Sequence, residues 1–463
     1  MKQQFRFASI ALFTALITGC ASLSAGNLFS HYSAQNRGVY QAVKAGAYSK
    51  AQQALPDHAA GDILDNLEKG RVNLLAQQYP ESKSWFELAD QAVKDQQSKA
   101  VISLSDSATS VGALAVNDNI TEYVPPDYEL GFLHLYLGLN YLKINDLEGA
   151  VIEMRRANQV QEQAKKQRQA ELEQAASDAK KQGVSANVGS ILSNYPDAGK
   201  KLQSIQNAYL MFLSGLLYEA SNDLNSAYVD YRRALAVMPE NQEIIDRTIA
   251  TATRLGMRQD LATLEQRYQA SSKLIDGQGR VIVLQEQSAV QAMGSWRLDL
   301  PVYDSRNQGT IYSLALPYYP RQNAERFSAL RINGQSLQEH LITDVNAMAQ
   351  NDLSERMTSI VIRQALRVVA KDRIRKETAQ DDDVGNLLFN VWNTLTEQPD
   401  TRSWQSLPAE IKSSTFVATS GQYTLEAGAK TYDFDIREGQ TTLVWISRQG
   451  NNATMWHKQL GRL

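Results

Sequence analysis

The sequence predicts a mainly α-helical N-terminal half, followed by an α+β C-terminal half that includes a small β-sandwich. Two observations predict this. From Leu28 to about Ala270, apolar residues recur at spacings of three and four, the period of an amphipathic helix. After Ser272 the period changes, and short β-branched runs separated by Gly, Asn and Pro indicate strands. We therefore expect domains at residues 28–270 and 271–463.

Composition limits the classes of partner. Hydrophobic residues make up 43% of the 463 residues and charged residues 21%, which is typical of a globular chain with a sizeable core. The net charge of −3 argues against nucleic acid, which is bound through an excess of Lys and Arg. Cys20 is the one cysteine, so neither a disulfide within the chain nor a cysteine metal cluster is possible.

The N-terminus has the pattern of an export signal. Lys2 and Arg6 precede an apolar run at 7–17, which is too short to span a hydrocarbon layer of about 30 Å. The sequence Ile17–Cys20 then resembles the lipobox of bacterial lipoproteins, in which the cysteine thiol takes the lipid. We predict a signal peptide at 1–19 and a lipidated tether at 20–27. The alternative is an ordinary signal peptide with a chance cysteine.

The same resemblance implies a location. The residues after Cys20 are Ala21 and Ser22 rather than Asp, which in known lipoproteins implies export to the outer membrane. Several acyl chains on one cysteine give stable anchoring. The expectation is a lipid-anchored protein of the outer membrane that faces the periplasm.

The helical half contains repeats. Asn207–Pro239 resembles a tetratricopeptide repeat, a helix pair of about 34 residues. The same template fits Phe132–Asn158, where Met154 replaces the tyrosine of the first match, and a third, weaker copy includes Gly70. Small residues stand where the two helices cross, and bulky residues fill the space between them. The residues assigned to this packing are Gly70, Phe86 and Ala89, then Gly138, Tyr141, Ala150 and Ala157, then Gly215, Tyr218, Ala227, Tyr231, Ala234 and Pro239.

An insertion near 159–206 separates the two better repeats. Gln159–Gln182 is almost free of apolar residues, which predicts a solvent-exposed helix that extends the second helix of the middle repeat. It is either an inert spur or an arm that contacts a partner.

First helices of a repeat array line a concave surface, which usually binds a partner. The residues expected to face inward are Leu67, Arg71, Leu74, Phe132, Leu135, Leu139, Leu142, Tyr209, Phe212 and Leu216. They are mostly apolar, which suits a helix or an extended apolar segment. Because large exposed apolar patches are rare, the alternative is that the groove is filled by this protein's own insertion or N-terminal helix.

The C-terminal half is expected to hold strands at 279–316, one or two helices at 337–377, and sandwich-like strands at 415–447. Five of the six tryptophans lie here, at Trp296, Trp392, Trp404, Trp445 and Trp456. Aromatic side chains can stack on sugars or pack in a core, so both interpretations stay open.

Four segments carry a wider resemblance, namely Asn140–Leu142, Glu148–Arg156, Leu314–Tyr319 and Asp400–Pro408. With them the chain resembles a family of uncharacterised repeat-containing lipoproteins of Gram-negative bacteria. The resemblance implies an architecture and brings no established activity.

No catalytic pattern accompanies these features. The histidines are scattered, and neither a GxSxG elbow nor a GxxxxGK[ST] phosphate loop occurs. We therefore expect no enzyme, cofactor or metal. The predicted function is a scaffold for an envelope protein partner in cell-envelope assembly or regulation. The alternative is a carbohydrate- or peptidoglycan-binding protein that uses the aromatic C-terminal half.

Overall fold

The computed structural model describes residues 30–103, 122–163, 206–271, 274–303, 309–321, 325–378 and 398–463. Helices dominate the first half, and residues 147–163 are helical as well. The remaining helices of this half are α3 (Tyr32–Gln35), α4 (Arg37–Lys44), α5 (Tyr48–Ala54), α6 (Asp62–Leu75), α7 (Tyr79–Ser103), α9 (Asp127–Lys143), α12 (Ala208–Ala220), α13 (Leu224–Val237), α14 (Gln242–Arg254) and α15 (Arg258–Arg267).

Local signals explain where the later helices begin. The side chains of Asn207, Asp223 and Asn241 each accept a hydrogen bond from a backbone N–H in the first turn of α12, α13 and α14. Such caps satisfy amides that have no partner within the helix.

The helices pack in pairs at the predicted glycines. A Cβ atom at Gly70 would lie 2.5 Å from the ring of Phe86, and one at Gly215 would lie 2.5 Å from the ring of Tyr231. At Gly138 the same distance of 2.5 Å separates the Cβ position from the Met154 methyl group. Each glycine therefore lets a bulky side chain of the following helix lie against its backbone, as the repeat template requires.

Two of the three sheets in the described residues lie face to face in the second half. The larger sheet has the strand order β11-β10-β1-β7-β6, and the smaller has the order β5-β4-β8-β9. The bounds are β1 (Gln278–Gln287), β4 (Arg331–Ile332), β5 (Gln335–Ser336), β6 (His340–Asp344), β7 (Glu410–Thr419), β8 (Gly421–Ala427), β9 (Lys430–Ile436), β10 (Thr441–Gln449) and β11 (Asn452–Gly461).

An apolar core lies between these sheets, built from residues such as Val281, Val283, Leu425, Phe434 and Val444. A sandwich is therefore present, but it includes strands outside the range 415–447 that the sequence predicted. Strand β1 pairs in parallel with β10 and antiparallel with β7. It therefore lies at the centre of the sheet, although it precedes these strands by more than a hundred residues in the sequence. Its residues 281–287 are buried throughout, which requires a central position covered on both faces.

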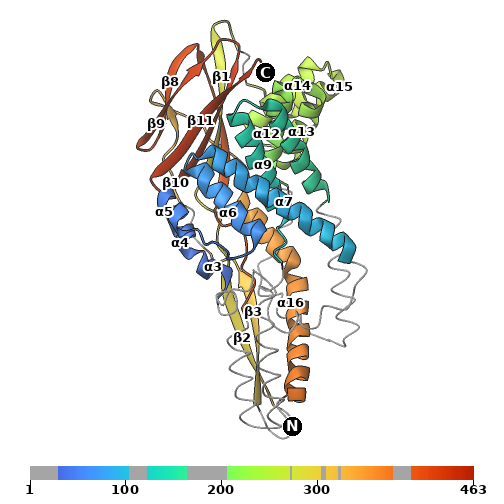
Figure 1. Ribbon diagram of the computed structural model, residues 1–463. Coiled ribbons are helices and arrows are strands. Elements are labelled where there is room, and N and C mark those ends of the chain that lie inside the picture. The colour runs from blue at the N-terminus through green and yellow to red at the C-terminus, as the bar shows by residue number, and fades with distance from the viewer. Residues whose placement is uncertain are drawn as a thin grey trace.

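The region between β1 and β7 forms a separate feature. Strands β2 (Gly294–Tyr303) and β3 (Gly309–Tyr318) make a hairpin, and α16 (Val345–Thr378) is one helix where one or two were expected. Leu316 of the hairpin packs with Leu353, Met357 and Val361 of α16. The hairpin and α16 run together away from the two sheets (Figure 1).

The helical half and the larger sheet share one hydrophobic core. It extends from Tyr32 in α3 through the repeat helices to Ile282 and Leu284 of β1, and to Trp445 and Trp456. Helices α6, α7, α9 and α12 lie beside the sheet (Figure 1). The expected boundary near residue 270 is thus a change of secondary structure and not a boundary between separate cores. Within the described residues, no helix is long and apolar enough to cross a membrane.

Candidate functional site

The concave face of the repeat helices is the candidate site, and it is covered. The ten residues predicted to line it are each at most 1% exposed. They are Leu67, Arg71, Leu74, Phe132, Leu135, Leu139, Leu142, Tyr209, Phe212 and Leu216. The sequence leaves open whether this groove binds a partner or is self-filled, and in this structure it is self-filled.

The covering segments differ from those expected. Strands β1 and β10 and the segment Thr401–Leu407 lie against the repeat helices, with a contribution from Tyr32 of the N-terminal helix α3. An apolar helical face and an apolar strand face attract each other without regard to sequence order, so the filler can come from any part of the chain. Most of the insertion, residues 164–205, and the predicted lipidation site Cys20 lie outside the described residues.

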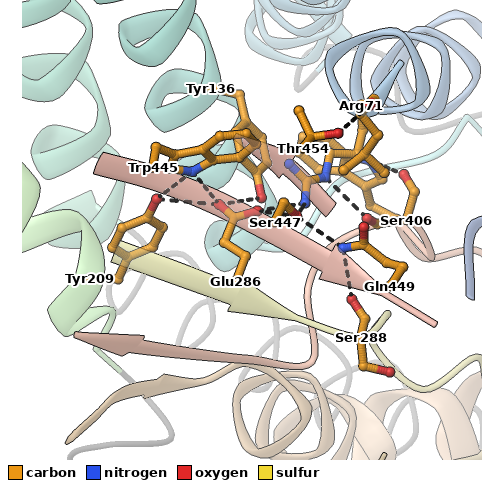
Figure 2. Close-up of polar contacts among 12 residues, drawn as sticks. Arg71, Tyr136, Tyr209, Glu286, Ser288, Ser406, Trp445, Ser447, Gln449 and Thr454 are labelled. Atoms are coloured by element: carbon orange, nitrogen blue, oxygen red, sulfur yellow. Dashed lines mark hydrogen bonds and ion pairs between the residues drawn. The ribbon is translucent and has the colours of Figure 1, made fainter. Parts of the chain in front are cut away.

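A fully buried ion pair lies at the centre of this contact. Arg71 Nη2 of α6 lies 2.5 Å from Glu286 Oε2 of β1, and neither side chain is exposed. The hydroxyls of Tyr136 and Tyr209 each donate to Glu286 Oε1 at 3.3 Å. Trp445 Nε1 donates to the same oxygen at 3.2 Å, so three elements besides α6 converge on one carboxylate (Figure 2).

Arg71 is held charged by its surroundings. Burial by itself would lower the pKa of Arg71, but Glu286, Tyr136 and Tyr48 together outweigh burial and raise this pKa above its usual value. Ser447 Oγ donates to Glu286 Oε2 at 3.1 Å, and the guanidinium lies 4.5 Å from the centroid of the Tyr136 ring. Buried charges are tolerated where hydrogen bonds satisfy most of their polar atoms, and in this pair Arg71 Nη1 is the side-chain atom without a partner in the described part of the chain.

The segment Thr401–Leu407 lies beside this pair and is bound through its backbone. Trp404 N donates to Glu129 Oε1 of α9 at 2.8 Å, and Gln405 N donates to Glu68 Oε1 of α6 at 2.7 Å. Arg71 Nε donates to the carbonyl oxygen of Ser406 at 3.3 Å. Side chains of two first helices therefore recognise three consecutive residues.

An aromatic box receives the tryptophan. The Trp404 ring lies edge-on to Phe86 and Tyr136, with centroid distances of 5.7 and 5.8 Å. Its Nε1 donates to Ser406 Oγ at 3.0 Å, which satisfies the indole within a turn of its own segment. Aromatic side chains in a core favour such edge-to-face arrangements.

The two glutamates that hold the segment have shifted pKa values. Burial raises the pKa of Glu68 to about 7, and hydrogen bonds from Ser406 and Gln405 oppose the shift. Burial likewise raises the pKa of Glu129 to about 7, opposed by the hydrogen bond from Tyr123. Both carboxyl groups therefore titrate close to neutral pH.

The aromatic set behind the sugar-binding alternative is mostly in the core. Trp404, Trp445 and Trp456 are at most 1% exposed. Trp296 is half-buried, and Trp392 lies outside the described residues. Three of the five side chains therefore have no face free for a sugar ring.

Sequence reasoning missed the residues that organise the site. All three of Glu68, Glu129 and Glu286 are buried, but only Glu129 interrupts an apolar stretch in the sequence, where a charge is a signal of a specific buried partner. Asp400–Pro408 carried the family resemblance but had no assigned role. The described residues hold no group of three or more His, Cys, Asp or Glu that could bind a metal ion.

Comparisons with known proteins give little more. No family model matches the chain, and no curated protein matches it. The solved structure of MamA AMB-1 is similar at 13% identity and a TM-score of 0.27, covering 51% of this chain and 95% of its own. That of MamA MSR-1 has 13% identity and a TM-score of 0.26, covering 51% and 93%. Values this low carry no argument, so the helix-pair architecture rests on the packing described above.

Proposed function

We propose that this protein is a lipid-anchored scaffold of the outer membrane, facing the periplasm, that binds a protein partner in cell-envelope assembly or regulation. One observation carries the proposal. Helix pairs packed at Gly70, Gly138 and Gly215 use the side chains of two first helices to hold a polypeptide segment by its backbone. Such a surface is chemically equipped to hold another chain segment.

The anchor is proposed from the sequence. Ile17–Cys20 has the lipobox pattern, and several acyl chains on one cysteine would keep the protein on a membrane. In cells fed labelled palmitate, wild type should incorporate label, and Cys20→Ala should not and should leave the membrane fraction or retain its signal peptide. Equal incorporation in the two proteins would contradict the lipid anchor.

The scaffold role is testable at the outer helices. Ile152 and Val229 are 47% and 56% exposed, and each lies on the second helix of a repeat. A photoreactive amino acid at either position should capture one and the same envelope protein in living cells. The control is Val417 on β7, which is 38% exposed but outside the repeats. Adducts that are absent, or the same at Val417, would count against a repeat scaffold.

The carbohydrate alternative has its own measurement. Purified peptidoglycan sacculi should fail to retain the protein, because the buried tryptophans cannot stack on sugars. Saturable retention that free glycan fragments abolish would replace the scaffold proposal with a glycan-binding one.

A further inference from the structure

The segment Thr401–Leu407 has the properties of a bound peptide. All seven residues are buried, although they form no helix or strand and turn at Gln405 and Ser406. Irregular segments usually lie on the surface, because their backbone groups need water or other partners. Here the partners are supplied by the first helices of the repeats, by Ser33 of α3, which bonds Thr401, and by Val290 N, which donates to Leu407 O at 2.7 Å.

The contacts do not depend on the segment's connection to β7. Glu129 and Glu68 accept the backbone N–H groups of Trp404 and Gln405, and Arg71 donates to the carbonyl of Ser406. These groups exist in any peptide. A segment from another chain could therefore make the same three hydrogen bonds.

Side chains add sequence preference. The Phe86–Tyr136 box holds Trp404. The amide nitrogen of Gln405 donates to Ser33 Oγ at 2.8 Å, and its amide oxygen accepts from Asn36 Nδ2 at 3.1 Å. The surface thus selects a tryptophan followed by a residue with both a donor and an acceptor.

The fit is incomplete. Asn36 Oδ1, Arg71 Nη1 and Ser403 Oγ are buried and have no hydrogen-bond partner in the described part of the chain. A buried polar atom without a partner is costly, so a different occupant that pairs Asn36 Oδ1 and Arg71 Nη1 and lacks the unpaired hydroxyl of Ser403 would bind this surface more favourably.

We propose that Thr401–Leu407 is an internal ligand, which occupies the concave face until a peptide segment of a partner protein replaces it. The replacing segment has a tryptophan, then a turn of small polar residues, and an acceptor for Arg71 Nη1. This inference rests on the proposed scaffold function and names the kind of partner segment.

Hydrogen exchange of the wild-type chain gives the first test. An exchangeable segment opens without global unfolding. The amides of Trp404 and Gln405 should therefore exchange at least tenfold faster than that of Val283, which lies in the central strand β1. Exchange at the same rate as Val283 at all denaturant concentrations would overturn the inference.

Peptide binding gives the second test. The probe is a fluorescent nine-residue peptide with the sequence of residues 400–408, compared with a version that has alanine in place of the tryptophan. The Trp404→Ala variant should bind the tryptophan peptide at least tenfold more tightly than the wild-type protein does. The same variant should bind the tryptophan peptide at least tenfold more tightly than it binds the alanine peptide.

A matched variant separates exchange from general loosening. Trp456 is equally buried but lies on β11, and it stacks on Trp445. Trp456→Ala should bind the peptide no better than wild type, and equal binding by the two variants would overturn the inference. If Trp404→Ala lacks a cooperative melting transition, Gln405→Ala replaces it, since this change removes two hydrogen bonds and little core volume.

The two proposals can fail separately. Loss of peptide binding with intact palmitate labelling and crosslinking would remove only the internal ligand. Peptide binding without any cellular adduct would remove only the envelope scaffold.

Discussion

The two faces of the larger sheet are built from the same strands in different ways. Alternate residues of β1 and β10 point to opposite faces. The face toward the smaller sheet is aliphatic, with Val281, Val283, Val444 and Ile446. The face toward the helices carries Ile282, Leu284, Glu286, Leu443, Trp445 and Ser447.

The two faces differ in how strongly their contacts depend on orientation. Aliphatic burial stabilises a contact in proportion to area and is insensitive to small rotations. The helix-facing side adds an ion pair whose partners come from α6, α9, α12 and β10, and these hydrogen bonds require one relative placement. We infer that the sandwich face contributes mainly stability, while the helix face determines how the repeats sit on the sheet.

The largest expected effect comes from breaking the ion pair. Arg71→Met leaves Glu286 buried without its cation, and removal of one member of such a pair costs about 3–5 kcal/mol of unfolding free energy. Urea denaturation measures it. The double variant Arg71→Met with Glu286→Leu should be more stable than Arg71→Met alone, because neither charge of this pair remains buried. A double variant less stable than Arg71→Met would contradict the inference that the ion pair determines how the repeats sit on the sheet without adding stability.

The next largest effect is the pH dependence of stability, which should come from the helix-facing side of the sheet and not from the sandwich face. Glu68 and Glu129 have a pKa of about 7 in the folded protein against 4.5 for the free side chain. The folded state therefore binds more protons between these values. The stabilising contribution of each group is complete below pH 4.5 and is lost as pH rises through about 7, by about 3 kcal/mol per group.

Chemical denaturation at pH 5 and pH 8 checks this, and stability should be lower at pH 8. Groups around Glu129 act in both directions: Tyr123 donates to it, Asp352 raises its pKa and Arg356 lowers it. Around Glu68, Tyr32 donates a hydrogen bond. Glu129→Gln should remove about half of the fall, whereas Glu87→Gln, at a side chain 47% exposed, should leave it unchanged. A flat wild-type profile would contradict the assignment.

A smaller effect is expected within the helix layer. Gly215→Ala places a Cβ atom 2.5 Å from the Tyr231 ring, and overpacking costs about 1–3 kcal/mol. Gly131→Ala is the matched control in α9, since its nearest neighbour, a Leu210 methyl group, is 3.4 Å away. Thermal melting should show a loss for Gly215→Ala and little change for Gly131→Ala. Equal losses would mean that helix crossings are not sites of close approach.

The smallest effect belongs to the sandwich face. Ile446→Val removes one methylene from a fully buried aliphatic site and should cost about 0.5–1.5 kcal/mol. Because no ionisable group is altered, the difference between pH 5 and pH 8 should equal that of wild type. A changed pH dependence would show that the two faces are coupled through β10.

Local chemistry made several features predictable. The pairs Gly70–Phe86, Gly138–Met154 and Gly215–Tyr231 each join neighbouring helices across a short turn, so their spacing along the chain encodes the contact. The change of period after Ser272 likewise preceded the first strand at Gln278. Strand pairing was less accessible, because β1 joins β10 and β7, each more than a hundred residues away in sequence.

The sequence by itself determined the helix pairs, the glycines at their crossings and the onset of strands, because these depend on residues of one helix or of two helices consecutive in the chain. The tertiary structure alone decided what covers the concave face. An apolar concave surface has the same sequence pattern whether it awaits a partner or packs on its own sheet, since hydrophobic burial does not specify its partner. The specifying contact, Arg71 with Glu286, joins residues 215 positions apart, and nothing in their local surroundings links them.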